Sequence, residues 1–302
     1  MKLFEKNVKA LEFDKVLEKL AEFTSCEDAR ENALNLRPES SLAMAQALLN
    51  QTADAHMLLA RFGGPSFGGL KNVNNALSRA NAGSVLNTRE LLDIAGVLRV
   101  IRTLSQWRES NAGVHSVLDP LFNALAPNKY LETAIFNAIV SEDEISDNAS
   151  PALADIRRKI RVQESKVREQ LEKFTRSQTN SKFLQENIIT QRNGRYVVPV
   201  KNEYRSEIAG LVHDTSSSGA TVFIEPMAVV EANNEIRVLQ AKEREEIERI
   251  LYELSVQAGD FAQSIKNSYE CALELNLIFA KRSMPIRSRR CRPYSTTAVL
   301  ST

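Results

Sequence analysis

A short β-rich run, His213 to Pro226, interrupts a sequence that otherwise has the pattern of long charged helices. Helical patterns extend from Pro151 to Gln178 before this run and from Met227 to about Lys281 after it. The first pattern has apolar residues in alternating steps of three and four, which is typical of a seam between two packed helices. The seam residues are Leu153, Ile156, Ile160, Val167, Leu171 and Phe174, with Gln163 at one core-like position between them. The pattern predicts a small β tip carried on an antiparallel helical stalk.

Four short strands are expected between the two helices. Asn193-Gly194 predicts a tight type I′ hairpin turn, because both residues tolerate positive φ. The run RYVVPVK follows this turn, and EIAGLVHD is expected to pair with TVFIEP across a serine-rich turn. Pro199 cannot donate a ladder hydrogen bond, which predicts an edge strand or a bulge. So small a sheet needs bracing by the helix ends.

The remaining pattern predicts a mainly α fold, and the low aromatic content of 6% agrees with it. Residues 1–150 are expected to form a helical domain, with helices near 10–23, 42–60, 88–107 and 131–140, another stretch ending at Pro38, and a loop at 63–69. Residues 151–180 form the ascending stalk helix, 181–227 the β tip, 228–281 one long descending helix and 282–302 a basic tail. The far half of the long helix must bury its apolar stripe against the helical domain.

Composition excludes several classes of protein. No apolar run approaches the roughly 18 residues needed to cross a bilayer, and the charged N-terminus lacks the apolar segment of a secretion signal. Cys26, Cys271 and Cys291 match neither a disulfide framework nor a zinc pattern, which favours the cytoplasm. Six bases and no acid follow from Lys281 onward, so residues 1–280 are mildly acidic despite the net charge of +1. Any nucleic-acid contact must therefore come from a local patch.

The sequence predicts no catalytic, cofactor or metal site. His213, Asp214 and Ser216 suggest a catalytic triad, but neighbours in a strand point in different directions. A second interpretation gives the serine-rich turn a structural role only, as the turn that closes a hairpin. A third is that its serine hydroxyls and the backbone at Gly219 contact a phosphate. His56, His115 and His213 are dispersed, and no glycine is followed by the lysine of a phosphate-binding loop.

Basic residues flank the predicted hairpins, with Tyr196 and Tyr204 between them, and we expect them to have few acidic neighbours. We interpret them as phosphate contacts. The predicted nucleic-acid-binding residues are Arg192, Arg195, Lys201, Tyr204, Arg205, His213, Ser216, Ser217, Ser218 and Gly219. The ascending helix carries eight basic and four acidic residues, a pattern equally typical of a solvated helix face.

The stretch RNGRYVVPVKNEYRSEIAGLVHDTSSSGATVFIEP closely resembles the clamp sequence of the second MutS family, the MutS-two proteins of bacteria. ALEFDKVLEKLAEFTSCEDA resembles the family's N-terminus, and the similarity covers residues 1 to about 281. The resemblance implies a helical core and lever domain followed by a clamp on two long helices. Family members are dimeric ATPases that bind branched or mismatched DNA, suppress homologous recombination and carry a Smr nuclease domain. A role in splitting collided ribosomes is also attributed to them.

In that family the long helix leads into a Walker-type ATPase domain, whereas this chain continues as SMPIRSRRCRPYSTTAVLST. The resemblance therefore implies a truncated or frameshifted product or a fragment, with no ATP or magnesium of its own and no activity alone. Three functions stay open: binding of double-stranded, branched or mismatched DNA, binding of the ribosome or its RNA, and an inert truncated product.

Overall fold

The structure is a computed structural model that describes residues 10–283. This part of the chain is mainly α-helical with short antiparallel strands, as predicted. It divides into a helical unit, residues 10–143 and 251–283, and a stalk unit, residues 144–250. Within residues 10–283, every helix is too short or too polar to cross a lipid bilayer. The predicted basic tail falls outside this range, apart from two residues at its start.

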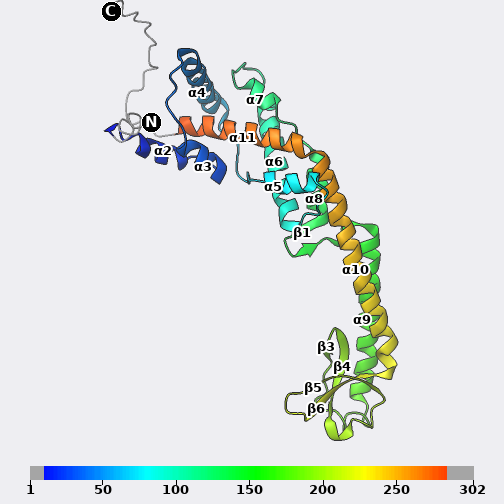
Figure 1. The fold of residues 1–302 in the computed structure, drawn as a ribbon. Helices are drawn as coiled ribbons and strands as arrows, with labels where there is room; N and C mark the ends of the chain where they lie inside the picture. Colours follow the sequence, from blue (N-terminus) through cyan, green and yellow to red (C-terminus); the bar gives the residue numbers. More distant parts are fainter. Residues whose placement is uncertain (1–9, 284–302) are drawn as a thin grey trace, which may run out of the picture. The chain divides into compact units, whose positions relative to one another are not determined.

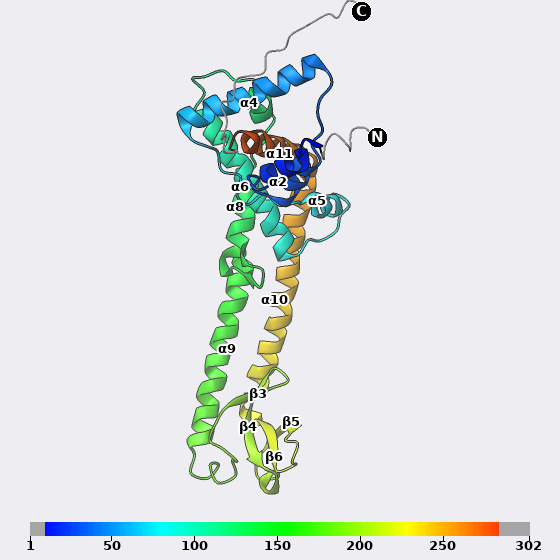
Figure 2. The same cartoon turned by 90° about the vertical axis from the view of Figure 1, so that its left-hand side faces the viewer.

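The helical unit is built around its last helix, which runs between the others (Figure 1, Figure 2). Tyr269 and Leu275 on that helix are fully buried. The predicted helix near 131–140 ends earlier than expected, because residues 139–141 form a strand, and two short helices were not predicted. The elements are α2 (Phe13–Ala21), α3 (Glu27–Leu34), α4 (Leu42–Phe62), α5 (Asn74–Asn81), α6 (Thr88–Ser110), α7 (Asp119–Asn123), α8 (Lys129–Ala138), β1 (Ile139–Ser141) and α11 (Ala262–Ser283).

Helix α6 begins where the sequence supplies a complete capping box. The Asn87 side chain accepts from the backbone N–H of Glu90 at 2.9 Å, and the Glu90 carboxylate accepts from the backbone N–H of Asn87 at 3.1 Å. Without these side chains, the backbone N–H groups of Asn87 and Glu90 would have no hydrogen-bond partner at the start of the helix. Arg79 of α5 also forms two hydrogen bonds to Glu90, which fixes α5 against the start of α6.

The long descending helix predicted over 228–281 is two helices, and the expectation of one continuous rod was wrong. Helix α10 (Met227–Asp260) ends one residue before α11, and the chain turns at Phe261 (Figure 1). Phe261 at this turn is 45% exposed. A Cβ on Gly259 would lie 2.8 Å from the carbonyl oxygen of Ala80. The helix therefore lies close against backbone just before the turn, where only glycine fits.

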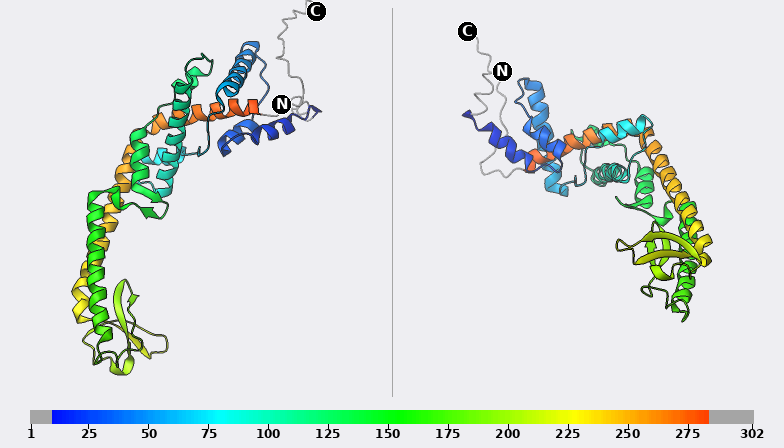
Figure 3. Two further views of the ribbon diagram at one scale, coloured as in Figure 1. Left: turned by 180° about the vertical axis from the view of Figure 1, so that it is seen from behind. Right: turned by 60° about the horizontal axis from the view of Figure 1, so that its bottom comes forward.

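The stalk unit carries its sheet where α9 ends and α10 begins (Figure 2, Figure 3). The sheet has strand order β3-β4-β6-β5 with all neighbours antiparallel, so the four predicted strands are confirmed. The elements are β2 (Glu144–Ile145), a 3₁₀ turn (Asp147–Ala149), α9 (Pro151–Arg176), β3 (Thr190–Arg192), β4 (Arg195–Lys201), a 3₁₀ turn (Asn202–Tyr204), β5 (Gly210–Thr215), β6 (Thr221–Pro226) and the first part of α10.

Polar contacts join α9 to α10. The Ser150 hydroxyl caps α9 by accepting from the N–H of Leu153 and donates to Glu246 of α10 at 2.6 Å. Hydrogen bonds from Arg249 and Ser150 lower the pKa of Glu246 to about 2. Gln163, the polar residue in the predicted seam, donates to Glu235 of α10 at 2.6 Å. The exception in the apolar pattern is therefore a polar contact between the two helices.

The Asn193-Gly194 turn has φ values of 52° and 74°, so the predicted positive-φ hairpin is confirmed. The expectation for Pro199 was wrong. β4 is an internal strand, and its register with β6 continues through Pro199 without a bulge. β3 pairs with β4 only as far as Val197, and the Pro199 carbonyl accepts from the N–H of Gln185. Proline is tolerated because its missing N–H lies on the side where the regular ladder has already ended.

The bulge lies in β5 instead, where the register shifts between Val212 and Asp214. The underside of the sheet packs on both helices, as the predicted bracing requires. Apolar residues from α9, β4, β6 and α10 form one core, with Leu171, Val198, Ile224 and Ile236 among its most buried members.

Candidate nucleic-acid interface

One end of the sheet holds a hollow of about 360 Å³. Lys201, the last residue of β4, lies opposite Thr221, the first residue of β6. The hollow brings together three predicted site residues, Lys201, Ser218 and Gly219. Its lining is completed by Gln185, Asn202, Glu203 and Ala220.

The serine-rich turn beside this hollow is held by its own hydrogen bonds. The Ser216 hydroxyl accepts from the N–H of Thr221 at 3.0 Å, and the Gly219 N–H donates to the Ser216 carbonyl at 2.8 Å. Gly219 has φ 72°, which favours glycine. Ser216 therefore stabilises the turn, as the structural interpretation of these serines predicts. Ser217 and Ser218 are exposed.

Two cations near the hollow have no carboxylate partner within residues 10–283. The Lys201 ammonium donates to the backbone carbonyl of Lys182 at 3.2 Å and lies 5.9 Å from the centre of the Tyr204 ring. Tyr204 also packs on Phe183. Arg205 is exposed and forms no ion pair in the described structure. Neither side chain is therefore neutralised by a carboxylate of the described residues.

Arg195 and His213 have a different environment, because both contact an internal carboxylate. Their contact with phosphate stays a prediction. Nη1 of Arg195 lies 2.8 and 3.0 Å from the two carboxylate oxygens of Glu225, which is fully buried. His213 hydrogen-bonds the same carboxylate, and Asn233 of α10 donates to it at 2.7 Å. A buried carboxylate needs such partners, since an unpaired charge is costly in the interior.

Asn233 also fixes the neighbouring backbone. Its side-chain nitrogen donates to the Tyr196 carbonyl at 3.1 Å, and its oxygen accepts from the Tyr196 N–H at 3.3 Å. Burial and the nearby Glu164 carboxylate raise the pKa of Tyr196. We call Arg195, His213, Glu225 and Asn233 the Glu225 network. It connects β4, β5, β6 and α10.

Arg192 is also paired, which corrects the expectation that it lies free. Its Nε lies 3.4 Å from a carboxylate oxygen of Asp214, and its guanidinium lies 4.1 Å from the centre of the Phe223 ring. About a third of the side chain is exposed. The ion pair connects β3 to β5, which are not neighbours in the sheet.

The sheet tip, residues 181–226, contains five basic and five acidic residues, so the expectation of few acidic neighbours was wrong. Arg192 and Arg195 show why this expectation was wrong. Their carboxylate partners, Asp214 and Glu225, are distant in the sequence and were not counted as neighbours. The sequence reasoning gave less weight to α9, which has twice as many bases as acids. Counting charge element by element identifies α9 as the basic surface.

His213, Asp214 and Ser216 have separate partners, so they do not form a catalytic triad. His213 contacts Glu225, Asp214 contacts Arg192, and Ser216 contacts the backbone of Thr221. Within residues 10–283, no group of three or more His, Cys, Asp or Glu side chains is placed to hold a metal ion.

No family model matches the chain. It is 45% identical over 287 residues to Endonuclease MutS2 of Ruminiclostridium cellulolyticum, an alignment covering 93% of this chain and 36% of that protein. It is 42% identical over 285 residues to Endonuclease MutS2 of Acetivibrio thermocellus, with the same two coverages. Endonuclease MutS2 of Clostridium perfringens is 43% identical over 276 residues, covering 91% of this chain and 35% of the relative. The chain belongs to the MutS2 family. It spans about a third of the length of these curated relatives.

In this MutS2 sequence, the stretch from Arg192 to Pro226 serves two purposes. Arg195, His213 and Glu225 lie in the internal Glu225 network and hold the strands together. Lys201, Arg205 and the exposed part of the serine turn face solvent at the other end of β4. A single run of sequence therefore supplies both the scaffold and the candidate contact surface.

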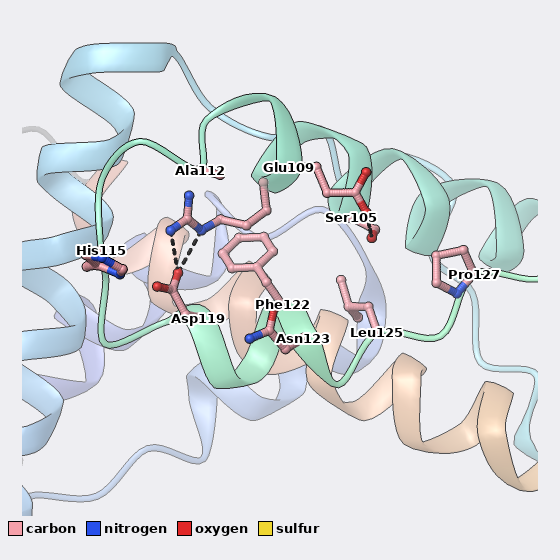
Figure 4. Close-up of a pocket in the computed structure, with 10 residues that line it drawn as sticks. Ser105, Glu109, Ala112, His115, Asp119, Phe122, Asn123, Leu125 and Pro127 are labelled. Atoms are coloured by element: carbon pink, nitrogen blue, oxygen red, sulfur yellow. Dashed lines mark hydrogen bonds and ion pairs between the residues drawn. The ribbon is translucent and has the colours of Figure 1, made fainter.

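A second hollow of the MutS2 chain, of about 590 Å³, lies between α6 and α7 in the helical unit (Figure 4). Arg108 lies in its wall, is 8% exposed and is paired with Asp119. The same guanidinium donates to the carbonyls of Asn111 and Val114 at 2.6 Å each. Its donors hold the α6–α7 connection, so the hollow offers no free cation from Arg108.

Proposed function

We propose that this chain is the nucleic-acid-binding segment of a MutS2 protein and acts in the cytoplasm. In this proposal the sheet end around Lys201 contacts the phosphate backbone of double-stranded or branched DNA. The observation that carries it is that Lys201 and the exposed Ser218 line one hollow at the sheet end, and that Lys201 has no carboxylate partner within residues 10–283. Arg205, exposed and without an ion pair in the same range, follows the adjacent turn and donates its backbone N–H to the Asn202 carbonyl. The relatives are named endonucleases, enzymes that act on nucleic acids, which supports the choice of partner.

The chemistry of these groups suits phosphate. An ammonium, a guanidinium and hydroxyl groups all donate hydrogen bonds, and phosphate oxygens accept them. Such contacts orient a protein on nucleic acid without reading its sequence. Because the sheet tip as a whole is neutral, attraction comes from the few cations near the hollow and not from a broad field. We therefore expect modest affinity and little sequence preference.

The test is the binding of fluorescently labelled duplex and four-way-junction DNA to the full chain, measured by anisotropy from about 50 to about 200 mM salt. The double variant K201Q/R205Q should weaken binding and reduce the salt slope by about 2. The matched control is K242Q/R244Q on α10, which removes the same charge from exposed positions. Equal behaviour of the two variants would contradict the proposal.

The ribosome is the competing partner, because ribosomal RNA presents the same phosphates. Unlabelled ribosomes and DNA duplex are therefore compared as competitors at equal phosphate concentration. DNA should displace the labelled DNA at least as well as ribosomes do. A much stronger competition by ribosomes would favour the ribosome-binding alternative over DNA.

A further inference from the structure

Charge is unevenly distributed within the stalk unit. Residues 144–250 contain seventeen basic and seventeen acidic residues, and the sheet tip is also balanced. Helix α9, in contrast, has eight bases against four acids, and the part of α10 within the unit has four bases against six acids. The positive charge of the unit therefore lies on one of its two helices.

The cations of α9 face solvent. Arg157 is the exception, since it bonds Glu243 of α10 and Asp147. The other seven are exposed and follow one another along the helix, namely Arg158, Lys159, Arg161, Lys166, Arg168, Lys173 and Arg176. A shallow hollow of about 410 Å³ lies among Arg158, Arg161, Val162, Ser165, Lys166 and Glu169.

The ion pairs that these cations form are exposed and weak. Lys173 pairs with Glu169 and Arg176 with Glu172, one helical turn apart, and all four side chains are largely exposed. Exposed pairs of this kind contribute less than about 1 kcal/mol each, so a phosphate can displace them. Lys166 and Arg168 form no ion pair with any carboxylate in residues 10–283.

We propose that the outward face of α9, centred on Lys166 and Lys173, which lie two turns apart on one side of the helix, is a second surface for the phosphate backbone of double-stranded DNA. The proposal rests on the function proposed above and extends it from the sheet end to the stalk. Arg158 and Lys173 on this face are fifteen positions apart, a rise of about 22 Å. One DNA strand presents a phosphate about every 3.4 Å along the helix axis, so this face can meet about six of them.

The alternative is a solvated helix face with no ligand. α10 provides the comparison, because its exposed Lys242 and Arg244 lie among acids on a helix of the same unit. A phosphate surface on α9 predicts that charge removal there weakens binding more than the same change on α10. A solvated face predicts equal, small effects for both.

The experiment measures binding of a DNA duplex of about 30 base pairs to the full chain by anisotropy between about 50 and about 200 mM KCl. It compares K166Q/K173Q with the control K242Q/R244Q and with K201Q/R205Q. All variants are repeated in a background with the tail arginines replaced, R287Q/R289Q/R290Q/R292Q, so that the tail cannot hide the effect. K166Q/K173Q should bind about fivefold more weakly and lower the salt slope by about 2.

The outcomes separate the two proposals. If K201Q/R205Q weakens binding while K166Q/K173Q matches the α10 control, the α9 surface is rejected and the function at the sheet end stands. If K166Q/K173Q alone weakens binding, the α9 surface stands and the sheet end is rejected. If the unaltered chain does not bind duplex DNA, both fail. A preference of more than about tenfold for duplex RNA would reject α9 as a DNA surface.

Discussion

Arg195 and Glu225 form an ion pair that connects two adjacent strands, with both carboxylate oxygens within 3.0 Å of one guanidinium nitrogen. The carboxylate is fully buried, and only 12% of the arginine side chain is exposed. The second guanidinium nitrogen donates to Asn234 of α10 at 2.6 Å. The pair thus joins the sheet to the helix that follows it.

Arg195→Ala should destabilise the stalk unit by about 3 kcal/mol, because it leaves the buried Glu225 carboxylate without its main counter-charge. Urea unfolding of the full chain, followed by circular dichroism, measures this. Arg192→Ala is the control, since its pair with Asp214 is partly exposed and should cost about 1 kcal/mol. A variant that loses DNA affinity at unchanged stability would instead make Arg195 a direct phosphate contact.

Gly210→Ala should destabilise the sheet by about 2 kcal/mol or more, as overpacking does. A Cβ at this position would lie 2.3 Å from the carbonyl oxygen of Glu225 and 2.7 Å from Ile224, both on the neighbouring strand β6. Thermal unfolding gives the comparison with Gly113→Ala, whose Cβ would meet no atom within 4 Å. Equal melting temperatures for the two variants would show that β5 can move away from β6.

Gly219→Ala should cost about 1 kcal/mol, because the residue has φ 72° and a Cβ there is strained even though the space is open. Gly219→Asn should cost less, since asparagine tolerates this backbone conformation. Unfolding free energies of both variants measure the difference. If alanine and asparagine are equally destabilising, the turn is limited by space and not by backbone strain.

Glu246 makes stability depend on pH at the acid side. Its folded pKa of about 2 is below the ordinary 4.5, so the carboxylate contributes its full stabilisation above pH 4.5 and loses it as the pH falls towards 2. Unfolding free energies of the unaltered chain and Glu246→Gln should therefore differ most at neutral pH and converge at about pH 2 to 3. A difference that grows on acidification would contradict the assignment. Ser150→Ala removes one of the three hydrogen bonds to this carboxylate together with the cap of α9, and relative to the unaltered chain its free energy of unfolding should change less with pH than that of Glu246→Gln does.

Local sequence determines the parts of the fold that were predicted best. Asn193-Gly194 specifies its turn because few other residues adopt positive φ at two successive positions. The seam of α9 was recognisable because helical spacing is a short-range property. Leu153 and Val167 are accordingly buried where the pattern placed them.

Features that depend on distant partners were not predictable from local pattern. The role of Arg195 depends on Glu225 and Asn234, which only the strand order and the start of α10 bring close. The break at Phe261 follows the close approach of Gly259 to Ala80, a contact between segments far apart in the sequence. The expectation of an edge strand or a bulge at Pro199 was wrong for the same reason. The local sequence does not show where the hydrogen-bond ladder between β3 and β4 ends.

The separation of charge between α9 and α10 has a mechanical consequence. A neutral body with its positive side on one helix and its negative side on the other is an electric dipole lying across its long axis. In the field of a polyanion such a dipole experiences mainly a torque, which turns α9 towards the polymer before contact. Raising the ionic strength until the Debye length falls below about 10 Å would therefore remove this alignment first. The short-range contacts between cations and phosphates would weaken only at higher salt.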